Sequence, residues 1–126
     1  MATITATVSI ISHTPPVAQI AWYGFTGSGD VGNMVSYPSA ADKTVQFLPS
    51  SGSWGNSLTA VLLGSQINST GVANILKDPT GASISTSSLQ TFVIMENPRF
   101  IAPHVTYSGS GTGLALDVII TAVAQR

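Results

Sequence analysis

The chain has 126 residues, of which four are Lys or Arg and five are Asp or Glu, so its formal net charge at pH 7 is −1. This balance disfavours electrostatic binding to nucleic acid or to an anionic membrane, and a chain without cysteine forms no disulfide and no cysteine-ligated metal site. Charged residues make up 7% of the chain, against about a quarter in ordinary soluble domains. Because soluble monomers keep their copies apart by interspersed charge, we expect neighbouring subunits to cover much of this surface.

The length and the 44% hydrophobic content fit a single domain over residues 1–126. The start of the chain has neither the positive segment nor the unbroken apolar stretch of a signal peptide. No run approaches the roughly 18 consecutive apolar residues of a membrane span, so no membrane-spanning segment is expected. The sequence therefore predicts a protein that is made and folded in a cytoplasm.

Apolar and polar residues alternate with a period of two near the start of the chain, where Ile4, Ala6, Val8 and Ile10 are separated by Thr and Ser. This alternation is typical of a half-buried strand with a β-branched polar face. Further segments have the length and composition of strands. In chain order, the expected strands cover residues 2–11, 17–25, 43–48, 58–63, 89–95, 100–107 and 114–121.

Gly, Pro and Ser separate these strands. Residues 27–42 are expected to form a loop, and Pro49 should end the strand that precedes it. Asp78–Gly81 has the residue order of a type I turn, and residues 108–113 form a glycine-rich hairpin connection. Pro103 cannot donate a ladder hydrogen bond, so we expect it at a sheet edge or a bulge. The pattern predicts an all-β fold: an antiparallel β-sandwich, jelly-roll-like, with about seven or eight strands and little or no helix.

The sequence offers few groups for catalysis. Residues 27–32 match the dinucleotide pattern G-x-G-x-x-G, but no helical period follows them and Pro38 interrupts the segment, so we interpret them as a surface loop. His13 and His104 are the candidate bases, and both are interpreted as incidental polar residues. The carboxylates are dispersed, and no spacing indicates a metal site. We therefore predict no catalytic, cofactor-binding or metal-binding residue and no enzymatic activity.

Aromatic side chains can form either a sugar-stacking platform or the centre of a protein interface. Phe92 and Phe100 are expected in the core. For Trp54, which stands in a Ser/Gly turn, a partner contact and burial in its own domain are equally open. Arg99 should have a fixed acceptor, a carboxylate or carbonyl of the same chain or the next. The residues expected at an interface are Ile4, Val8, Trp22, Tyr23, Trp54 and Arg99, and the segments expected to contact other chains are residues 2–11 and 27–42.

From residue 43 to the end, the order of these signals is similar to that of a known group of proteins. Its strongest pieces are Asn97-Pro98-Arg99-Phe100-Ile101 and the closing apolar strand, preceded by a Gly-Ser-Trp-Gly turn and by Leu76-Lys77-Asp78-Pro79-Thr80-Gly81. Over about two thirds of its length the chain resembles small virion structural proteins of tailed bacteriophages, including head decoration (cement) proteins. Two departures, Ala102 in place of a further Arg and residues 67–71 in place of an Asp-Gly turn, leave the position in the particle open.

The resemblance implies a β-sandwich that forms a trimer on the virion, at the capsid surface, over junctions between major capsid protein subunits. Such a subunit stabilises the shell by bridging neighbours, without catalysis or a cofactor, and it is made in the host cytoplasm. The residues leave two other functions open. One is a tail-associated or carbohydrate-binding, receptor-binding sandwich that uses Trp22, Tyr23 or Trp54. The other is a small enzyme, for which acids, bases and nucleophiles are scarce.

Overall fold

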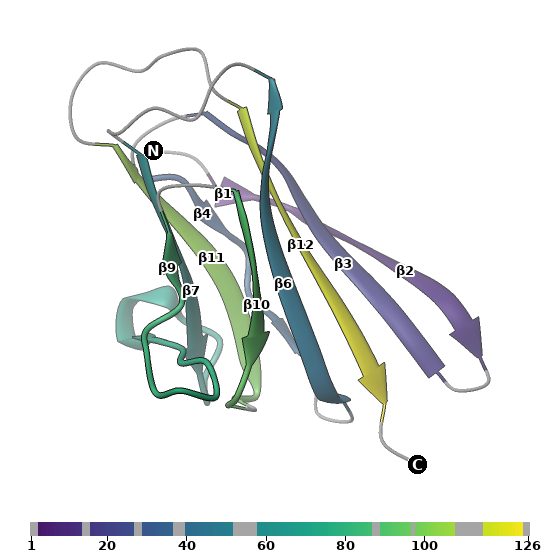
Figure 1. Ribbon diagram of the computed structural model, residues 1–126. Helices are drawn as coiled ribbons and strands as arrows, with labels where there is room; N and C mark the ends of the chain where they lie inside the picture. Colours follow the sequence, from purple (N-terminus) through teal and green to yellow (C-terminus); the bar gives the residue numbers. More distant parts are fainter. Residues whose placement is uncertain are drawn as a thin grey trace.

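The computed structural model describes residues 3–13, 16–26, 29–36, 40–51, 58–86, 89–96, 98–107 and 115–124. These residues form two β-sheets that pack face to face (Figure 1). The strands are β1 (Thr3–Ile4), β2 (Ala6–His13), β3 (Pro16–Phe25), β4 (Val31–Gly32), β5 (Val35–Ser36), β6 (Ala40–Ser51), β7 (Leu58–Ser65), β8 (Asn74–Ile75), β9 (Ser85–Thr86), β10 (Gln90–Ile94), β11 (Phe100–Tyr107) and β12 (Ala115–Ala124). One short 3₁₀ helix, η1 (Thr70–Val72), completes the described elements. The all-β sandwich predicted from the sequence is therefore confirmed.

One of the two sheets, called sheet B, contains five strands in the order β10-β6-β12-β3-β2. All neighbouring strands in it are antiparallel. Alternate residues of these strands face the other sheet. Ile120 of the central strand β12 pairs with Val45 of β6 and with Ile20 of β3, and all three are 0% exposed. Because directly opposed side chains pack against each other, this row forms the middle of the core.

The other sheet, called sheet A, contains seven strands. Five of them follow the order β1-β4-β11-β7-β8, and the remaining two are β5, which pairs with β11, and β9, which pairs with β7. Its inner face carries Ala60 and Leu62 of β7 and Ile101 and Val105 of β11, all fully buried. These side chains join those of sheet B in one hydrophobic core cluster. The predicted interior position of the strand at 58–63 is confirmed, because β7 has strands on both sides.

The N-terminal segment belongs to both sheets. Strand β1 lies parallel to β4 in sheet A, whereas β2 lies antiparallel to β3 in sheet B. A single residue, Thr5, separates the two strands. Ile4 and Ala6, on either side of this crossover, are half-buried and pack against the core cluster. The crossover therefore closes one side of the sandwich.

Strand β6 is longer than the sequence predicts, because it continues through Pro49 to Ser51. The expected end at Pro49 is wrong for a reason that lies in the neighbouring strand. Pro49 pairs with Leu116 of β12, and the register shifts between Leu116 and Ala115. Because the register is irregular at this point, the ladder does not require the backbone N–H that proline lacks.

Pro103 lies buried in sheet A beside an irregularity that agrees with the predicted bulge, because three residue steps on β11, from His104 to Ile101, oppose four steps on the other segment, from Val31 to Val35. It pairs with Leu62 of β7 in an uninterrupted register. On the other side of β11, the register of β4 includes His104 and that of β5 includes Phe100 and Ile101. The paired strand residues on that side thus stop short of Pro103, so its missing N–H breaks no ladder hydrogen bond.

The described residues of the segment at 27–42, which are 29–36 and 40–42, belong to the sandwich and do not form the predicted surface loop. They contain β4, β5 and the start of β6, and residues 29–36 include no helix that could hold a dinucleotide. Asp30 is 3% exposed, and Gly32 is buried. A Cβ on Gly32 would lie 2.6 Å from Trp22 Nε1 and 2.7 Å from Pro103 Cδ. Glycine is required at this position because the backbone runs against two rings.

The turn predicted at Asp78–Gly81 is confirmed. The backbone N–H of Gly81 donates to the Asp78 carbonyl at 3.0 Å. The Asp78 carboxylate accepts hydrogen bonds from the Thr80 hydroxyl at 2.6 Å and from the backbone N–H groups of Thr80 and Ala82 at 2.9 and 3.1 Å. The Thr80 hydroxyl, followed by these N–H groups, lowers the pKa of Asp78 below its ordinary value of 3.8.

We expect Gly32→Ala to lower the free energy of unfolding by about 1–3 kcal/mol, because the new Cβ would overlap the Trp22 and Pro103 rings in a packed core. Gly71→Ala is the matched control, since a Cβ there would find its nearest neighbour at 3.6 Å. Urea unfolding of both variants and the parent protein measures the difference. Equal losses for the two variants would contradict the close approach at Gly32.

The lowered pKa of Asp78 means that its ionised form stabilises the folded state above pH 3.8 and that this stabilisation is lost as the pH falls through the folded-state pKa. Asp78→Asn keeps an acceptor oxygen but has no charge at any pH. We therefore expect the parent protein to be more stable than Asp78→Asn at neutral pH, and the gap to shrink in acid. Urea midpoints at pH 6 and at about pH 3 test this, and a gap that stays constant would contradict it.

Candidate interaction surfaces

Titratable side chains are not gathered into a site in the described part of the chain. No group of three or more His, Cys, Asp or Glu residues there could hold a metal ion. His13 is exposed at the end of β2 in sheet B, and His104 is half-buried in β11 of sheet A, opposite Val61. The structure therefore does not unite the two candidate bases, and the candidate sites are surfaces.

None of the described helical segments has the length and apolar character needed to cross a membrane.

Strand β2 carries three exposed aliphatic side chains close together. Val8 is 52% exposed, and Ile10 and Ile11 are each 57% exposed. Val8 pairs with Ile20, which is 0% exposed, so Val8 lies on the inward face of sheet B but outside the area that sheet A covers. Figure 1 shows the lower half of β2 extending away from sheet A. We call Val8, Ile10 and Ile11 the β2 ledge.

Asn33 fixes β2 to the rest of the sandwich. Its side-chain Oδ1 accepts a hydrogen bond from the backbone N–H of Ala6 at 2.7 Å and another from Trp22 Nε1 at 3.2 Å. Its backbone carbonyl accepts from Trp22 Nε1 at 3.1 Å, and its N–H donates to the Ile4 carbonyl at 2.9 Å. One residue between β4 and β5 therefore holds both N-terminal strands and the buried indole.

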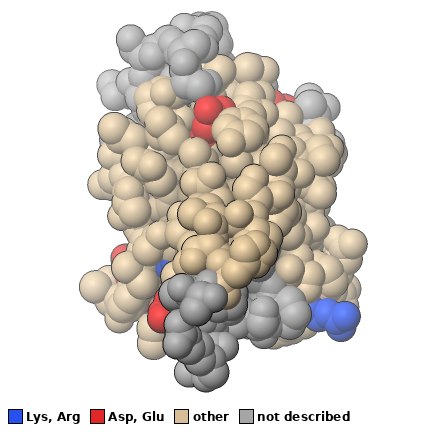
Figure 2. Space-filling model, turned by 90° about the vertical axis from the view of Figure 1, so that its right-hand side faces the viewer, with Lys and Arg blue, Asp and Glu red and all other residues tan. Residues whose placement is uncertain are grey.

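The outward face of sheet B is poor in charge. The register places on it Thr7, Ser9, Gln19, Ala21, Tyr23, Thr44, Gln46, Thr91, Val93, Ile119 and Thr121. The charged residues on the described part of this face are Asp42 and Asp117, and the Asp117 carboxylate accepts a hydrogen bond from the Gly24 N–H at 3.1 Å. Figure 2 shows the corresponding side of the molecule with a broad central area that has no charged side chain.

Three of the predicted interface residues are on or near these surfaces. Val8 is part of the β2 ledge, and Tyr23 is 53% exposed on the outward face of sheet B. Ile4 is half-buried against the core cluster beside them. Trp22 corrects the prediction, because it is 0% exposed and its indole N–H is bound to Asn33. The indole completes the core of its own chain.

The remaining predicted interface residues lie elsewhere. Arg99 is exposed, and its guanidinium lies over the Phe100 ring at 5.3 Å from the centroid. This is a cation–π contact, and the predicted carboxylate or carbonyl acceptor stays a prediction. Trp54 lies outside the described residues. Whether any of these residues contacts another chain stays a prediction.

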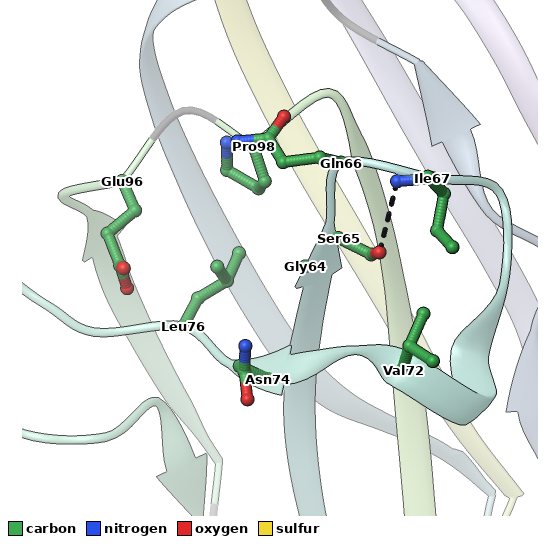
Figure 3. Close-up of a pocket in the computed structure, with 9 residues that line it drawn as sticks. All are labelled: Gly64, Ser65, Gln66, Ile67, Val72, Asn74, Leu76, Glu96 and Pro98. Carbon is green, nitrogen blue, oxygen red and sulfur yellow. Dashed lines mark hydrogen bonds between the residues drawn. The ribbon is translucent and has the colours of Figure 1, made fainter.

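A hollow of about 470 Å³ lies at the end of sheet A, where β7 stops and the chain turns toward η1 (Figure 3). Its lining residues are Gly64, Ser65, Gln66, Ile67, Val72, Asn74, Leu76, Glu96 and Pro98. We call it the Gly64 hollow. Sequence reasoning missed it, because its walls come from three segments of the chain that no local pattern connects. The Gly-Ser pair that ends the apolar strand at 58–63 is the one signal that marks its floor.

The chain is similar to several known structures. The SPBc2 prophage-derived protein YomS superimposes with a TM-score of 0.56 over 84% of this chain and 94% of that chain, at 15% sequence identity. The K1 cleaved adhesin domain of Lys-gingipain from Porphyromonas gingivalis W83 gives a TM-score of 0.43 at 9% identity, covering 98% of this chain and 85% of that one. A carbohydrate binding module of Cellvibrio mixtus lichenase 5A gives 0.41 at 13% identity, covering 95% and 88%.

The similarity to YomS shows that the two proteins have a common β-fold. No protein-family model and no curated protein sequence matches the chain.

We expect Asn33→Ala to lower the free energy of unfolding by about 1–3 kcal/mol, because the Ala6 N–H loses its acceptor at a part-buried position. Hydrogen exchange should accelerate at the amides of β1 and β2 more than at those of β12. Asn68→Ala, at an exposed position, is the control and should change stability by less than about 0.5 kcal/mol. Unchanged exchange in the N-terminal strands would contradict the role given to Asn33.

Proposed function

We propose that this chain is a non-enzymatic bacteriophage head decoration (cement) protein. In this proposal the chain forms a homo-oligomer, a trimer, that binds the outside of the major capsid protein shell and stabilises it by bridging subunits. It is made in the host cytoplasm and ends on the virion surface. The observation that carries the proposal is the β2 ledge, an apolar and uncharged sheet edge that the chain itself leaves uncovered.

The ledge supports association because natural proteins rarely leave such an edge open. Soluble β-proteins protect edge strands with Lys, inward charges or bulges. Strand β2 has one register shift, between Ile10 and Ser12, but no Lys, Arg, Asp or Glu, and Val8 and Ile10 continue the inward apolar face beyond the area under sheet A. A neighbouring subunit that covers this face would remove apolar surface from water and complete the sheet edge.

The outward face of sheet B supports a second kind of contact. Its Ser, Thr and Gln side chains can bind a partner directly or through ordered water without the desolvation cost of many ions. A stable protein interface buries about 1,200–2,000 Å² in total, which a face of five strands can supply. A bridging subunit needs more than one contact surface, and the ledge and this face lie on the same sheet.

Two further observations agree with a phage particle as the setting. The motif Asn97–Ile101 and the closing strand resemble those of tailed-phage virion proteins. The fold is shared with YomS, whose name describes a prophage-derived protein. The capsid as the location follows from the resemblance to head decoration proteins, and the co-sedimentation experiment below tests it.

A tail-associated or receptor-binding function is the alternative, and the exposed ring of Tyr23 favours it. A sugar-stacking platform requires aromatic faces that are open to solvent. Trp22 cannot supply one, since it is 0% exposed. Saturable binding on a glycan array that Tyr23→Ala abolishes, without binding to capsid shells, would support this alternative against the decoration function.

We expect the protein to have a mass near three times the 12.9 kDa of the chain in light scattering at micromolar concentration, and to co-sediment saturably with shells of its cognate major capsid protein. Val8→Lys should weaken self-association at least about tenfold, because the contact would bury a charge. Met95→Lys is the matched control, since Met95 is 63% exposed and belongs neither to the β2 ledge nor to the residues placed on the outward face of sheet B.

A parent protein that stays monomeric at these concentrations, or equal effects of the two substitutions, would contradict association through β2. Association without binding to shells would contradict the decoration function while leaving the interface intact.

A further inference from the structure

The Gly64 hollow has a preformed floor. A Cβ on Gly64 would lie 2.5 Å from Leu76 Cδ2 and 2.6 Å from Pro98 Cγ, so only glycine allows these side chains to close beneath it. Leu76 is 3% exposed and is held from both sides, since its N–H donates to the Leu62 carbonyl at 2.9 Å and its carbonyl accepts from the Ile84 N–H at 2.8 Å. The floor therefore needs no rearrangement before it receives a ligand.

One wall of the hollow is apolar and accessible. Ser65, 8% exposed, accepts the Ile67 N–H on its Oγ at 3.1 Å and so fixes the turn that follows β7. The turn presents Ile67 at 57% exposure, and Val72 of η1 follows at 58% exposure. Figure 3 shows these two aliphatic side chains on the right of the hollow, with Ser65 and Leu76 between them and the opposite wall.

The opposite wall carries a fixed negative charge. Glu96 is the one charged residue among the nine that line the hollow. Its Oε1 accepts the backbone N–H of Lys77 at 2.7 Å, which restrains the carboxylate and leaves Oε2 outside that bond. The residues that the structure describes give Glu96 no ion pair. Glu96 is exposed, so its carboxylate is accessible to a cationic ligand.

We propose that the Gly64 hollow binds a Lys or Arg side chain that a partner protein presents on an extended segment. Such a side chain combines an aliphatic stem, which would pack along Ile67 and Val72, with a cationic head that would bind Glu96. The segment is extended because the hollow runs beside β8, the last strand in the order of sheet A, where an added strand can pair with Asn74 and Ile75.

This inference goes beyond the proposed function and does not depend on it. The hollow lies on sheet A, whereas the β2 ledge and the charge-poor face belong to sheet B. Self-association or shell binding can therefore fail while the hollow binds its ligand, and the reverse can also occur.

The test is a titration of the ¹⁵N-labelled full chain with the peptide acetyl-Thr-Val-Arg-Val-Thr-amide, followed by NMR. A second peptide carries citrulline, which has the shape of arginine without its charge. We expect saturable shifts at the amides of residues 64–67 and 96, and an affinity about fivefold higher for the arginine peptide. Glu96→Gln keeps an acceptor for the Lys77 N–H and should remove this preference, so that both peptides bind with equal affinity.

Asp117→Asn is the matched control, because it also removes one carboxylate charge while keeping the acceptor for the Gly24 N–H. It should leave the fivefold preference intact. The proposal is wrong if the shifts scatter over the surface or are absent, if the citrulline peptide binds the parent protein as tightly as the arginine peptide, or if Glu96→Gln leaves the preference unchanged. It is also wrong if maltose shifts the same amides and the arginine peptide does not, since the hollow would then be a sugar site. The comparison of the two peptides on the parent protein stands even where a variant fails to fold.

Discussion

The buried indole of Trp22 has one polar atom, and the architecture of this protein follows from how that atom is satisfied. The backbone carbonyl and the side-chain oxygen of Asn33 both accept a hydrogen bond from the indole N–H. The same side-chain oxygen also accepts the Ala6 N–H at the start of β2. Gly32 must be a glycine for the chain to pass this close to the ring. The angle at which β2 leaves the sandwich, and so the position of the ledge, depends on this junction.

The scarcity of charge is greater at the surface than in the sequence. Asp30 is 3% exposed and Lys43 is 2% exposed, so two of the nine charged residues are removed from solvent in the described structure. Burial lowers the pKa of Lys43 below 10.5, and the neighbouring Asp42 carboxylate opposes that shift. What faces water on sheet B is therefore mostly hydroxyl, amide and aliphatic. A surface of this kind gives weak electrostatic repulsion between copies, which suits dense packing of subunits.

Local periodicity was enough to predict the long strands, because alternation reports directly which face of a strand is buried. The expectation drawn from proline agreed with the structure at Pro103 and was wrong at Pro49. Pro103 lies in the interior of sheet A because the neighbouring paired residues stop short of it, and Pro49 stays in β6 because β12 shifts register opposite. The burial of Trp22 was predicted wrongly and the Gly64 hollow was missed, since both depend on residues that only the tertiary fold brings together.

The single residue between β1 and β2 has a mechanical consequence. Thr5 links a strand paired in one sheet to a strand paired in the other. A tension applied along β2 toward its C-terminal end would act in shear on the β2–β3 ladder and, through Thr5, on the β1–β4 ladder of the opposite sheet. Hydrogen bonds loaded in shear break together, whereas hydrogen bonds that are peeled apart break one after another. A force applied at this strand would thus be carried by both sheets of the sandwich.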